Sequence, residues 1–569
     1  MPRQHRSRGD RNRSTGPTPS RSRAAGLFLA SLLLLSFGVG SVHAGTAPSA
    51  DAADSALSES NTTATAAVLA VYPDPTRDDD AGEYVLLRLP DAGNWSVSDG
   101  EATTRLRNVS GRVLVTPEPR ALGEPVENET TVVEGSFALA NGGEAVSLRR
   151  GNETVHRVRY GESSEGERYL PAADEWRPRG LDPRSAVPTG PANATAFLLP
   201  DSPEVPIETL REAEDRILLA GYTFTSERVA DVLLATRARG VDVRVLVEAE
   251  PVGGASAQQA RVLDRLAAAG VEVRVVGVGA NRFAYHHPKY AVADGRALVL
   301  SENWKPSGVG GASSRGWGVR VENGSTAAEL AALFRNDSGA PDTRTWQSFR
   351  ENRQFESAPP ANGSYPKAFP AEHVTATNVT LLTAPGNAES ELVAAIDAAE
   401  ERIDVLQPTL GRQDNALVRA TLRAAQRGVE VRILLSGAWY SAEENDALVT
   451  WLNDWAERND APLTARIAEP GGRYGKVHAK GLLIDDDLAV VGSLNWNENS
   501  ATENREVALA LHGPEPVAFY RESFDADWRG GSGGERLWLY AAGAVAAVLV
   551  AVLVATRSLN FAAIEKWEE

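Results

Sequence analysis

The stretch HAKGLLIDDDLAVVGSLN occupies residues 478–495, and a similar stretch, HPKYAVADGRALVLSEN, occupies residues 287–303. In both, a His-x-Lys motif is followed after four residues by an aspartate, and a Ser-x-Asn triplet closes the stretch. A single His-x-Lys motif arises often by chance. Two copies that close the same kind of repeat indicate an internal duplication, which decides the fold before any individual element does.

The duplication extends well upstream of the two motifs. Residues 239–246 read RGVDVRVL and residues 427–434 read RGVEVRIL, and the offset between equivalent positions drifts only from 186 to 192 residues. In each copy, apolar strand-like runs alternate with helical runs, a pattern typical of a sheet covered on both faces. We expect two α/β halves at residues 195–345 and 379–528, joined by a linker at residues 346–378.

The N-terminal part of the chain has a different pattern. Residues 65–162 contain short alternating apolar runs separated by turn sequences, which predicts a small all-β sandwich. The segments AVYPDP, GEYVLLRL and LANGGEAVSLRR within it resemble the lamin-tail domain, which implies an immunoglobulin-like module that binds or spaces rather than catalyses. Residues 45–64 are poor in apolar side chains and predict a disordered spacer, and residues 163–194 predict a linker rich in proline and charge.

Both ends of the chain predict membrane targeting. Residues 1–44 combine an Arg-rich start, an apolar run and a small-residue cleavage signature, as in a secretory signal peptide. Residues 537–556 form an uncharged run long enough to cross a bilayer as a helix, after a glycine-rich stalk at residues 529–536. Together with ten Asn-x-Ser/Thr sequons from Asn61 to Asn378, these features predict a single-pass cell-membrane protein with its bulk outside and residues 557–569 in the cytoplasm.

Composition narrows the chemistry. The chain of 569 residues has a formal net charge of −18 and contains no cysteine, which excludes disulfides and thiolate metal sites. Only six of its 58 basic residues are lysines, and two of these lysines belong to the duplicated motifs. The acidic, lysine-poor composition resembles that of proteins from salt-loving archaea, in which dense carboxylates keep the surface hydrated at high salt.

The duplicated motifs supply the groups that metal-free cleavage of a phosphodiester requires. Two histidines titrate near neutrality, so one can attack phosphorus while the other protonates the leaving oxygen. Two lysines and two Ser-x-Asn triplets can bind the non-bridging oxygens. One phosphate between two related half-sites fits this stoichiometry, with no metal and no cofactor.

The motifs and the repeat resemble the phospholipase D superfamily over about residues 195–530. The resemblance implies a duplicated sandwich of mixed sheets flanked by helices, and a phosphohistidine intermediate that water or an alcohol resolves. By the usual chain order of the family, His287 would be the nucleophile and His478 the acid, and Glu506 would orient a histidine. Carried over residue by residue, the catalytic set would be His287, Lys289, Asp294, His478, Lys480, Asp485 and Glu506, and the phosphate-binding set Ser301, Asn303, Ser493 and Asn495.

The first copy departs from the family pattern at two places. Leu300 stands where the second copy has Gly492, and the triplet SRG at residues 314–316 stands where a counterpart of Glu506 would lie. The orientation of one histidine is therefore open, and the two histidine roles could be reversed. A degenerate, non-catalytic first half is an alternative.

Three functions remain open at this stage. A phospholipid hydrolase or headgroup-exchanging enzyme at the cell surface agrees with the predicted membrane anchor. A nuclease of the same superfamily would use the same motif, although the acidic chain shows no basic stripe with interleaved aromatic residues. The third is a non-enzymatic cell-surface binding protein. Because both half-sites lie in one chain, we expect a monomer whose partners are a phosphodiester substrate and the membrane, with nucleic acid as the alternative substrate.

Overall fold

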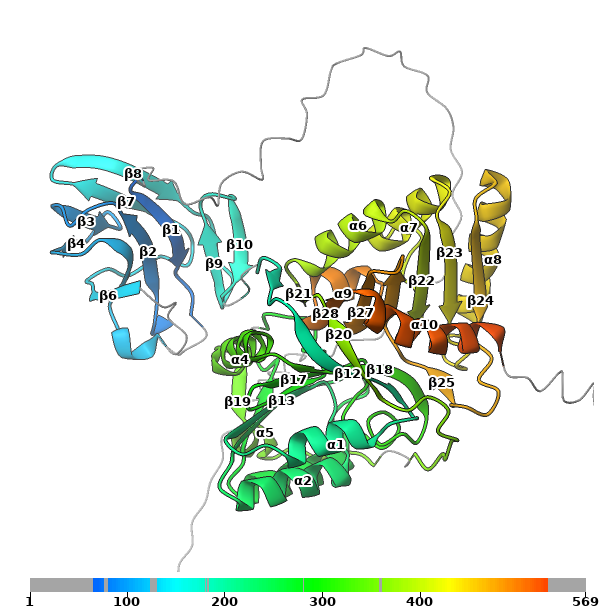
Figure 1. The fold of residues 1–569 in the computed structure, drawn as a ribbon. Coiled ribbons are helices and arrows are strands. Elements are labelled where there is room, and N and C mark those ends of the chain that lie inside the picture. The colour runs from blue at the N-terminus through cyan, green and yellow to red at the C-terminus, as the bar shows by residue number, and fades with distance from the viewer. Residues whose placement is uncertain are drawn as a thin grey trace, which may run out of the picture. The chain divides into compact units, whose positions relative to one another are not determined.

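The computed structural model describes residues 65–75, 80–122, 130–179, 181, 184–279, 281–357 and 361–530 (Figure 1). The predicted signal peptide, spacer and transmembrane segment lie outside these residues. Within the described residues, no helix is both long and apolar enough to span a membrane.

The N-terminal module is built from two sheets. Its strands are β1 (Ala67–Tyr72), β2 (Tyr84–Leu89), β3 (Trp95–Ser98), β4 (Thr103–Leu106), β5 (Gly111–Thr116), β6 (Thr130–Glu134), β7 (Ala145–Arg150), β8 (Glu153–Arg159), β9 (Glu167–Leu170) and β10 (Glu175–Pro178). The sheet orders are β10-β9-β1-β2-β5-β6 and β4-β3-β7-β8. Alternating apolar side chains of both sheets, among them Val71, Trp95 and Val113, form one buried core. The module extends past its predicted end at residue 162, because the β9–β10 hairpin pairs with β1 through Tyr169 and Val71.

The first half of the duplicated region forms a mixed sheet with helices around it. The strands are β12 (Ala192–Leu199), β13 (Arg216–Gly221), β14 (Asp242–Glu248), β15 (Glu272–Val276), β16 (Tyr290–Ala293), β17 (Arg296–Leu300), β18 (Ser314–Glu322), β19 (Thr343–Thr345) and β20 (Glu372–Ala376). The helices are α1 (Glu204–Arg211), α2 (Glu227–Ala238), α3 (Ala257–Ala268), α4 (Gly324–Gly339) and α5 (Trp346–Arg350). The predicted linker 346–378 is therefore partly structured, since α5 begins it and β20 pairs with β12.

The second half repeats this arrangement. Its strands are β21 (Asn378–Ala384), β22 (Arg402–Gln407), β23 (Glu430–Leu435), β24 (Leu463–Ile467), β25 (Lys476–Val477), β26 (Gly481–Ile484), β27 (Leu488–Gly492) and β28 (Glu506–His512), and the short β11 (Val187–Pro188) pairs with β21. Its helices are α6 (Ala388–Ala398), α7 (Ala416–Gln426), α8 (Ala442–Asn459), α9 (Glu498–Thr502) and α10 (Pro514–Arg529).

Seven strands follow the same order in the two halves. The first half reads β15-β14-β13-β16-β17-β18-β12, and the second reads β24-β23-β22-β26-β27-β28-β21. In both, the first three strands are parallel to one another and the remaining neighbours are antiparallel. The predicted duplicated, mixed α/β fold is confirmed.

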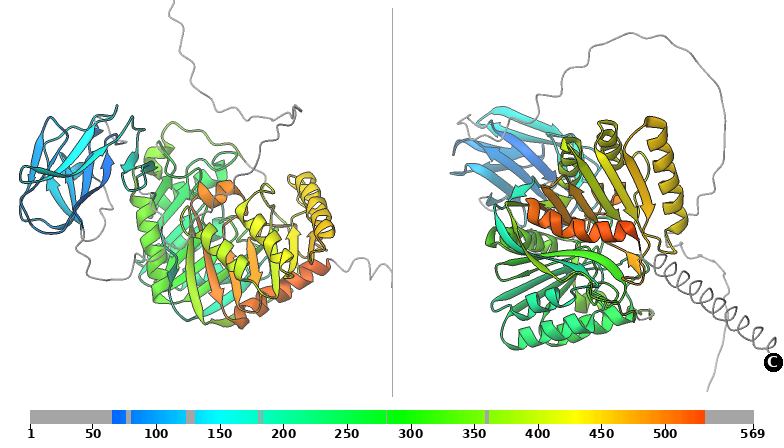
Figure 2. Two further views of the ribbon diagram at one scale, coloured as in Figure 1. Left: turned by 90° about the horizontal axis from the view of Figure 1, so that it is seen from above. Right: turned by 45° about the vertical axis from the view of Figure 1, so that its right-hand side comes forward.

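The two sheets meet in one shared core. It includes Leu198 and Trp317 of the first half, Leu483 and Val491 of the second, and apolar residues of α4 and α10. The rings of Trp317 and Tyr520 stack with centroids 4.6 Å apart, and in the right-hand view of Figure 2 α10 lies between the two halves. Burial of such aromatic side chains contributes about 1.5–3 kcal/mol each. The shared core therefore fixes one half against the other.

Candidate active site

Each His-x-Lys motif is anchored by the opposite half of the molecule. His287 lies just before β16, and His478 lies between β25 and β26. The backbone N–H of His287 donates to the carbonyl of Arg505 at 2.9 Å, and the N–H of His478 donates to the carbonyl of Arg315 at 2.9 Å. The motifs therefore enter a single site from two sides.

Arg315 and Arg505 are fixed in turn by crossed ion pairs. Arg315 Nε lies 2.9 Å from a carboxylate oxygen of Asp527 on α10, and Arg505 Nε lies 3.1 Å from Asp337 on α4. All four side chains are buried, and removing one partner of a buried pair costs about 3–5 kcal/mol. These ion pairs lie outside the His-x-Lys motifs, and the same Arg-to-Asp spacing of 22 residues, which occurs in both copies, is the signal by which they could have been predicted.

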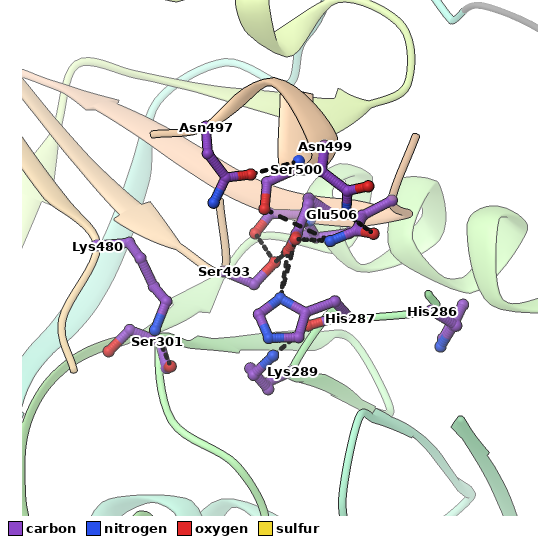
Figure 3. Close-up of polar contacts among 12 residues, drawn as sticks. His286, His287, Lys289, Ser301, Lys480, Ser493, Asn497, Asn499, Ser500 and Glu506 are labelled. Carbon is purple, nitrogen blue, oxygen red and sulfur yellow. Dashed lines mark hydrogen bonds and ion pairs between the residues drawn. The ribbon is translucent and has the colours of Figure 1, made fainter. Parts of the chain in front are cut away.

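Each histidine is also oriented by a carboxylate from the opposite half. Nδ1 of His287 lies 2.9 Å from both carboxylate oxygens of Glu506 (Figure 3), and Nδ1 of His478 lies 3.2 Å from Glu302 Oε1. Both carboxylates are buried. A neutral imidazole that donates its Nδ1–H to a carboxylate leaves Nε2 as a lone-pair acceptor. The geometry thus presents two Nε2 atoms for reaction with a substrate.

Glu302 supplies the carboxylate that the sequence pattern lacked. In the ladder, Leu300 pairs with Gly318 as Gly492 pairs with Ala508, so Gly316 occupies the position of Glu506. A Cβ at Gly316 would lie 2.2 Å from Cγ of Glu302, so the glycine opens the space that the Glu302 side chain fills. The orientation of His478, which the sequence pattern left open, is therefore set by the residue after the motif serine, Glu302.

Leu300 is compensated in the same way. A Cβ at Gly492 would lie 2.5 Å from Cβ of Ala508, so the second copy needs glycine there. In the first copy the partner is Gly318, whose own Cβ would lie 2.9 Å from Leu300. The first half thus has the larger residue on β17 and glycine on β18, whereas the second half has glycine on β27 and the larger residue on β28. The sheet therefore accommodates Leu300.

The two motif lysines converge on the same space. Both are buried, and Lys480 Nζ donates to the carbonyl of His478 at 2.6 Å and approaches the carbonyl of Ser301 at 3.5 Å. Lys289 Nζ donates to the carbonyl of His287 and lies 5.3 Å from the ring centre of Tyr222. Burial lowers the pKa of Lys480 to about 7 and that of Lys289 well below its ordinary value. An anion between them would offset this desolvation.

Burial and positive neighbours keep both histidines neutral. Burial lowers the pKa of His287 to about 4, because the attraction of Glu506 only partly offsets it and the motif lysines act in the same direction as burial. The pKa of His478 is lowered well below its ordinary value by burial and by Lys480, Lys289, Lys305 and Lys476. In the substrate-free state both imidazoles therefore have a free lone pair.

The two carboxylates differ in protonation. Burial raises the pKa of Glu302 to about 7, although the nearby lysines oppose it. Burial also acts to raise the pKa of Glu506, but His287, Lys289 and a 2.5 Å hydrogen bond from Ser493 outweigh it and lower the pKa. Near neutral pH, Glu506 is charged while Glu302 can still hold a proton. The two half-sites are thus chemically unequal.

The predicted phosphate ligands divide into two kinds. Ser301 and Ser493 are fully buried; Ser301 Oγ accepts from the backbone N–H of Trp317, and Ser493 bonds Glu506. The serines therefore position strands and a carboxylate rather than face a phosphate. The side-chain oxygen of Asn303 is buried without a hydrogen-bond partner in the described structure, and Asn495 is partly exposed. The asparagines remain the amides available to a ligand.

Asp294 and Asp485 lie at the far end of their strands from the histidines. They follow β16 and β26, each with positive φ, whereas the histidines precede these strands. A four-residue strand is about 13 Å long. The carboxylate of Asp294 accepts from the backbone N–H groups of residues 214–216, and that of Asp485 from residues 400–402. Their contacts indicate that they fix a turn to a neighbouring strand, and their predicted part in the reaction stays a prediction.

His286 takes no part in the site, and its side chain points away from that of His287 (Figure 3). It is buried, its N–H donates to Glu248 at 2.7 Å, and its ring lies 3.4 Å from Asp337. No group of three or more His, Asp or Glu side chains among the described residues is arranged to hold a metal ion.

Comparison with known sequences adds to this geometry. Residues 207–338 and 392–528 match the family described as "Cardiolipin synthase, PLD-like domain". Both halves are thus similar to this phospholipase D-like family. The matched segments contain both histidines, both lysines and both carboxylates of the site.

The phospholipase D-like region also has named relatives. The chain is 25% identical over 334 residues to cardiolipin synthase A of Proteus mirabilis (strain HI4320), covering 53% of this chain and 62% of that protein. For cardiolipin synthase A of Yersinia pseudotuberculosis serotype O:1b (strain IP 31758) the identity is 26% over 311 residues, covering 50% and 57%. The chain thus spans less than two thirds of these relatives. Among solved structures, phosphatidylserine synthase of Haemophilus influenzae Rd KW20 matches with 14% identity and a TM-score of 0.46, covering 59% of this chain and 86% of that one.

Proposed function

We propose that the protein is a phospholipase D-type phosphodiesterase that hydrolyses phospholipids or exchanges their headgroups through a phosphohistidine intermediate. The crossed pairs His287–Glu506 and His478–Glu302 carry the proposal, because they present two oriented imidazoles beside two buried lysines. The similarity to proteins named cardiolipin synthase supports phospholipid as the substrate class.

The unequal carboxylates support distinct roles for the two histidines. The charged Glu506 accepts from Nδ1–H of His287 and increases the electron density at Nε2, which suits a nucleophile. Glu302, with a pKa raised to about 7 by burial, shares a proton with His478, which suits an acid and base. His287 is therefore the proposed nucleophile and His478 the proposed acid.

The reaction balances in two steps. In the first, Nε2 of His287 bonds to phosphorus, the bond from phosphorus to the alcohol oxygen breaks, and Nε2–H of His478 gives that oxygen its proton while the proton held by Glu302 moves to Nδ1 of His478. In the second, His478 takes a proton from water or an incoming alcohol, whose oxygen bonds to phosphorus while the phosphorus–nitrogen bond breaks. Lys289, Lys480 and the asparagine amides hold the non-bridging oxygens throughout.

The test separates the substrate from the mechanism. The purified protein is incubated at high salt with phospholipid vesicles, DNA and RNA in parallel, and products are quantified. Turnover of lipid is expected, whereas turnover of nucleic acid alone would overturn the lipid assignment. With a 4-nitrophenyl phosphodiester labelled at phosphorus, whose leaving group needs no proton, His478→Ala should accumulate an acid-labile phosphoenzyme because the second step still needs a base, and His287→Ala should not. Absence of a phosphoenzyme in both variants would contradict the covalent step.

We further propose that the site acts at the outer surface of the membrane, supported by the predicted signal peptide, anchor and sequons. Protease added to intact cells should degrade the catalytic region and spare a C-terminal tag. A protected catalytic region would mean that the orientation is inverted.

A further inference from the structure

Two lysines beside the site are not used by the reaction described above. The chain has only six lysines, and besides the motif pair two more, Lys305 and Lys476, lie close enough to lower the pKa of His478. Lys305 comes two residues after Asn303, and Lys476 two residues before His478. In a chain that elsewhere uses arginine, lysine is concentrated where phosphate chemistry is expected.

Hydrogen bonds hold the two lysines on one side of the site. Lys305 is fixed in a tight loop, because its N–H donates to the carbonyl of Asn303 at 2.8 Å and its carbonyl accepts from Gly308 at 3.0 Å. Gly308 packs against Glu302, since a Cβ there would lie 2.7 Å from Oε2. The same loop leads to Ser314, which pairs with Lys476 in the β18–β25 ladder. Both lysines therefore flank the Glu302–His478 pair.

An aromatic residue completes this corner and opens it to solvent. Lys476 Nζ lies 3.2 Å from the hydroxyl of Tyr440 and 4.8 Å from its ring centre. Tyr440 is 50% exposed, and the preceding Trp439 is 90% exposed. The corner is thus reachable from outside the protein.

The opposite side of the site lacks these charges. In the repeat, Asn497 is the equivalent of Lys305 and Tyr285 the equivalent of Lys476. Asn497 caps α9 by accepting from the N–H of Ser500 at 2.8 Å, and Tyr285 packs edge-on against Tyr222 with ring centres 5.9 Å apart. The extra positive charge therefore belongs to the His478 side alone.

The charge balance calls for a second anion there. The four lysines outnumber the two carboxylates, Glu302 and Glu506, and Glu302 can still hold a proton near neutral pH. Lys305 and Lys476 are therefore in excess, and the partly buried ammonium of Lys305 is costly unless it is paired. A phosphodiester brings a single negative charge to the centre of the site. In the proposed reaction, His478 protonates the departing alcohol and deprotonates the incoming one, so this corner faces the alcohol portion.

We propose that Lys305, Lys476 and Tyr440 form a subsite for a second anionic group, a phosphate monoester or carboxylate, on the alcohol portion of the substrate. The subsite rests on the proposed phospholipid activity and specifies its substrate class. The charged alcohol can be the departing headgroup of the donor lipid or the incoming acceptor, and both use the same chemistry.

The experiment has one arm for each source of the anion. The donor arm compares cleavage of phosphatidylinositol 4-phosphate and phosphatidylinositol in otherwise identical vesicles. The acceptor arm compares glycerol 3-phosphate and glycerol as acceptors. The wild type should prefer the charged partner by about tenfold or more in kcat/KM in at least one arm, which corresponds to about 1.4 kcal/mol. Ionic strength is held constant, because screening weakens exposed charge pairs.

Substitutions assign the preference to the lysines. Lys305→Gln and Lys476→Gln should each reduce the ratio of charged to neutral kcat/KM, and the double variant should bring it near one. Lys305→Arg and Lys476→Arg should retain it. Lys367→Gln, at an exposed lysine in the segment between the halves, is the matched control. Thermal melts check that each variant folds.

The outcomes distinguish this subsite from the proposed function. If the wild type shows no preference for the charged partner in either arm, or if the glutamine variants keep the wild-type preference, the subsite is wrong while the phospholipid activity stands. If the wild type cleaves neither lipid, the proposed function fails and the subsite fails with it.

Discussion

The two halves of the duplicated region reach the same site geometry from different sequences. The second half places a carboxylate at Glu506 and leucine at position 494, while the first half places the carboxylate at Glu302 and glycine at position 316. Each solution orients a histidine of the other half. In both halves a carboxylate meets the histidine of the other half. In the first half it follows β17, at Glu302, whereas in the second half it begins β28, at Glu506.

The difference has a chemical consequence. Glu506 bonds both His287 and Ser493, and its pKa is lowered; Glu302 is surrounded by lysines, and burial raises its pKa to about 7. The duplicated fold supplies two similar imidazoles, and the carboxylates that orient them have different proton affinities. A symmetric scaffold can thereby divide one reaction between a nucleophile and an acid.

The largest effect expected is the loss of either histidine. His287→Ala should lower kcat/KM by at least about 10⁴-fold with every substrate, because it removes the nucleophile. His478→Ala should lower it by about 10²–10⁴-fold with a natural alcohol leaving group but far less with a 4-nitrophenyl phosphodiester, whose leaving group needs no proton. Steady-state kinetics with the two leaving groups check this. If it is His287→Ala whose kcat/KM recovers with the 4-nitrophenyl substrate, the roles of the two histidines are reversed.

The motifs and the strand order could be predicted because they are local and repeated. The histidines and the lysines were predicted from the repeated spacing, and the carboxylate of Glu506 from the resemblance to the phospholipase D superfamily. Glu302 could not be found in this way, because its role depends on the space left by Gly316 on the next strand. The turn contacts of Asp294 and Asp485 could not be predicted, because a motif records which residues recur and not what they contact. The β9–β10 hairpin was read as a linker because its apolar pattern is short.

The second prediction concerns the relocated carboxylate. Glu302→Gln should lower kcat/KM by about 10²-fold or more, because His478 loses its oriented proton. Adding Gly316→Glu to Glu302→Leu reproduces the arrangement of the second half and should recover much of the loss relative to Glu302→Leu alone. Residue 316 does not have a positive φ, so glutamate can adopt its backbone conformation. The atom nearest to a Cβ at residue 316 is Cγ of Glu302, which is the side chain that the first substitution replaces. A double variant no better than the single one would mean that Glu302 does more than orient His478.

The third prediction is that Glu302, in the first half, sets the pH dependence of kcat/KM. Since the pKa of Glu302 is raised to about 7, its proton is present below pH 7 and lost above it. kcat/KM should therefore fall about tenfold per unit above pH 7. The break should disappear in Glu302→Gln and persist in Glu506→Gln, because the pKa of Glu506 is lowered. A break near pH 7 that survives in Glu302→Gln would assign it to another group.

The smallest effect on kcat/KM is expected for Asp294 and Asp485, which make the same contacts in the two halves. Their substitution should lower stability instead. Asp294→Asn and Asp485→Asn each replace a carboxylate that accepts three backbone N–H bonds, so each should lower the free energy of unfolding by about 1.5–3 kcal/mol. Burial acts to raise the pKa of both groups, but the backbone hydrogen bonds outweigh it and the pKa values are lowered. Their contribution is therefore present at neutral pH and lost as pH falls below the ordinary value of 3.8 toward the folded pKa. Denaturant unfolding should show a difference from wild type at pH 7 that shrinks with acidification, while kcat/KM at a temperature well below the melting transition stays within about twofold of wild type. A loss of kcat/KM comparable to that of the histidine variants, in protein that remains folded, would return these aspartates to the reaction.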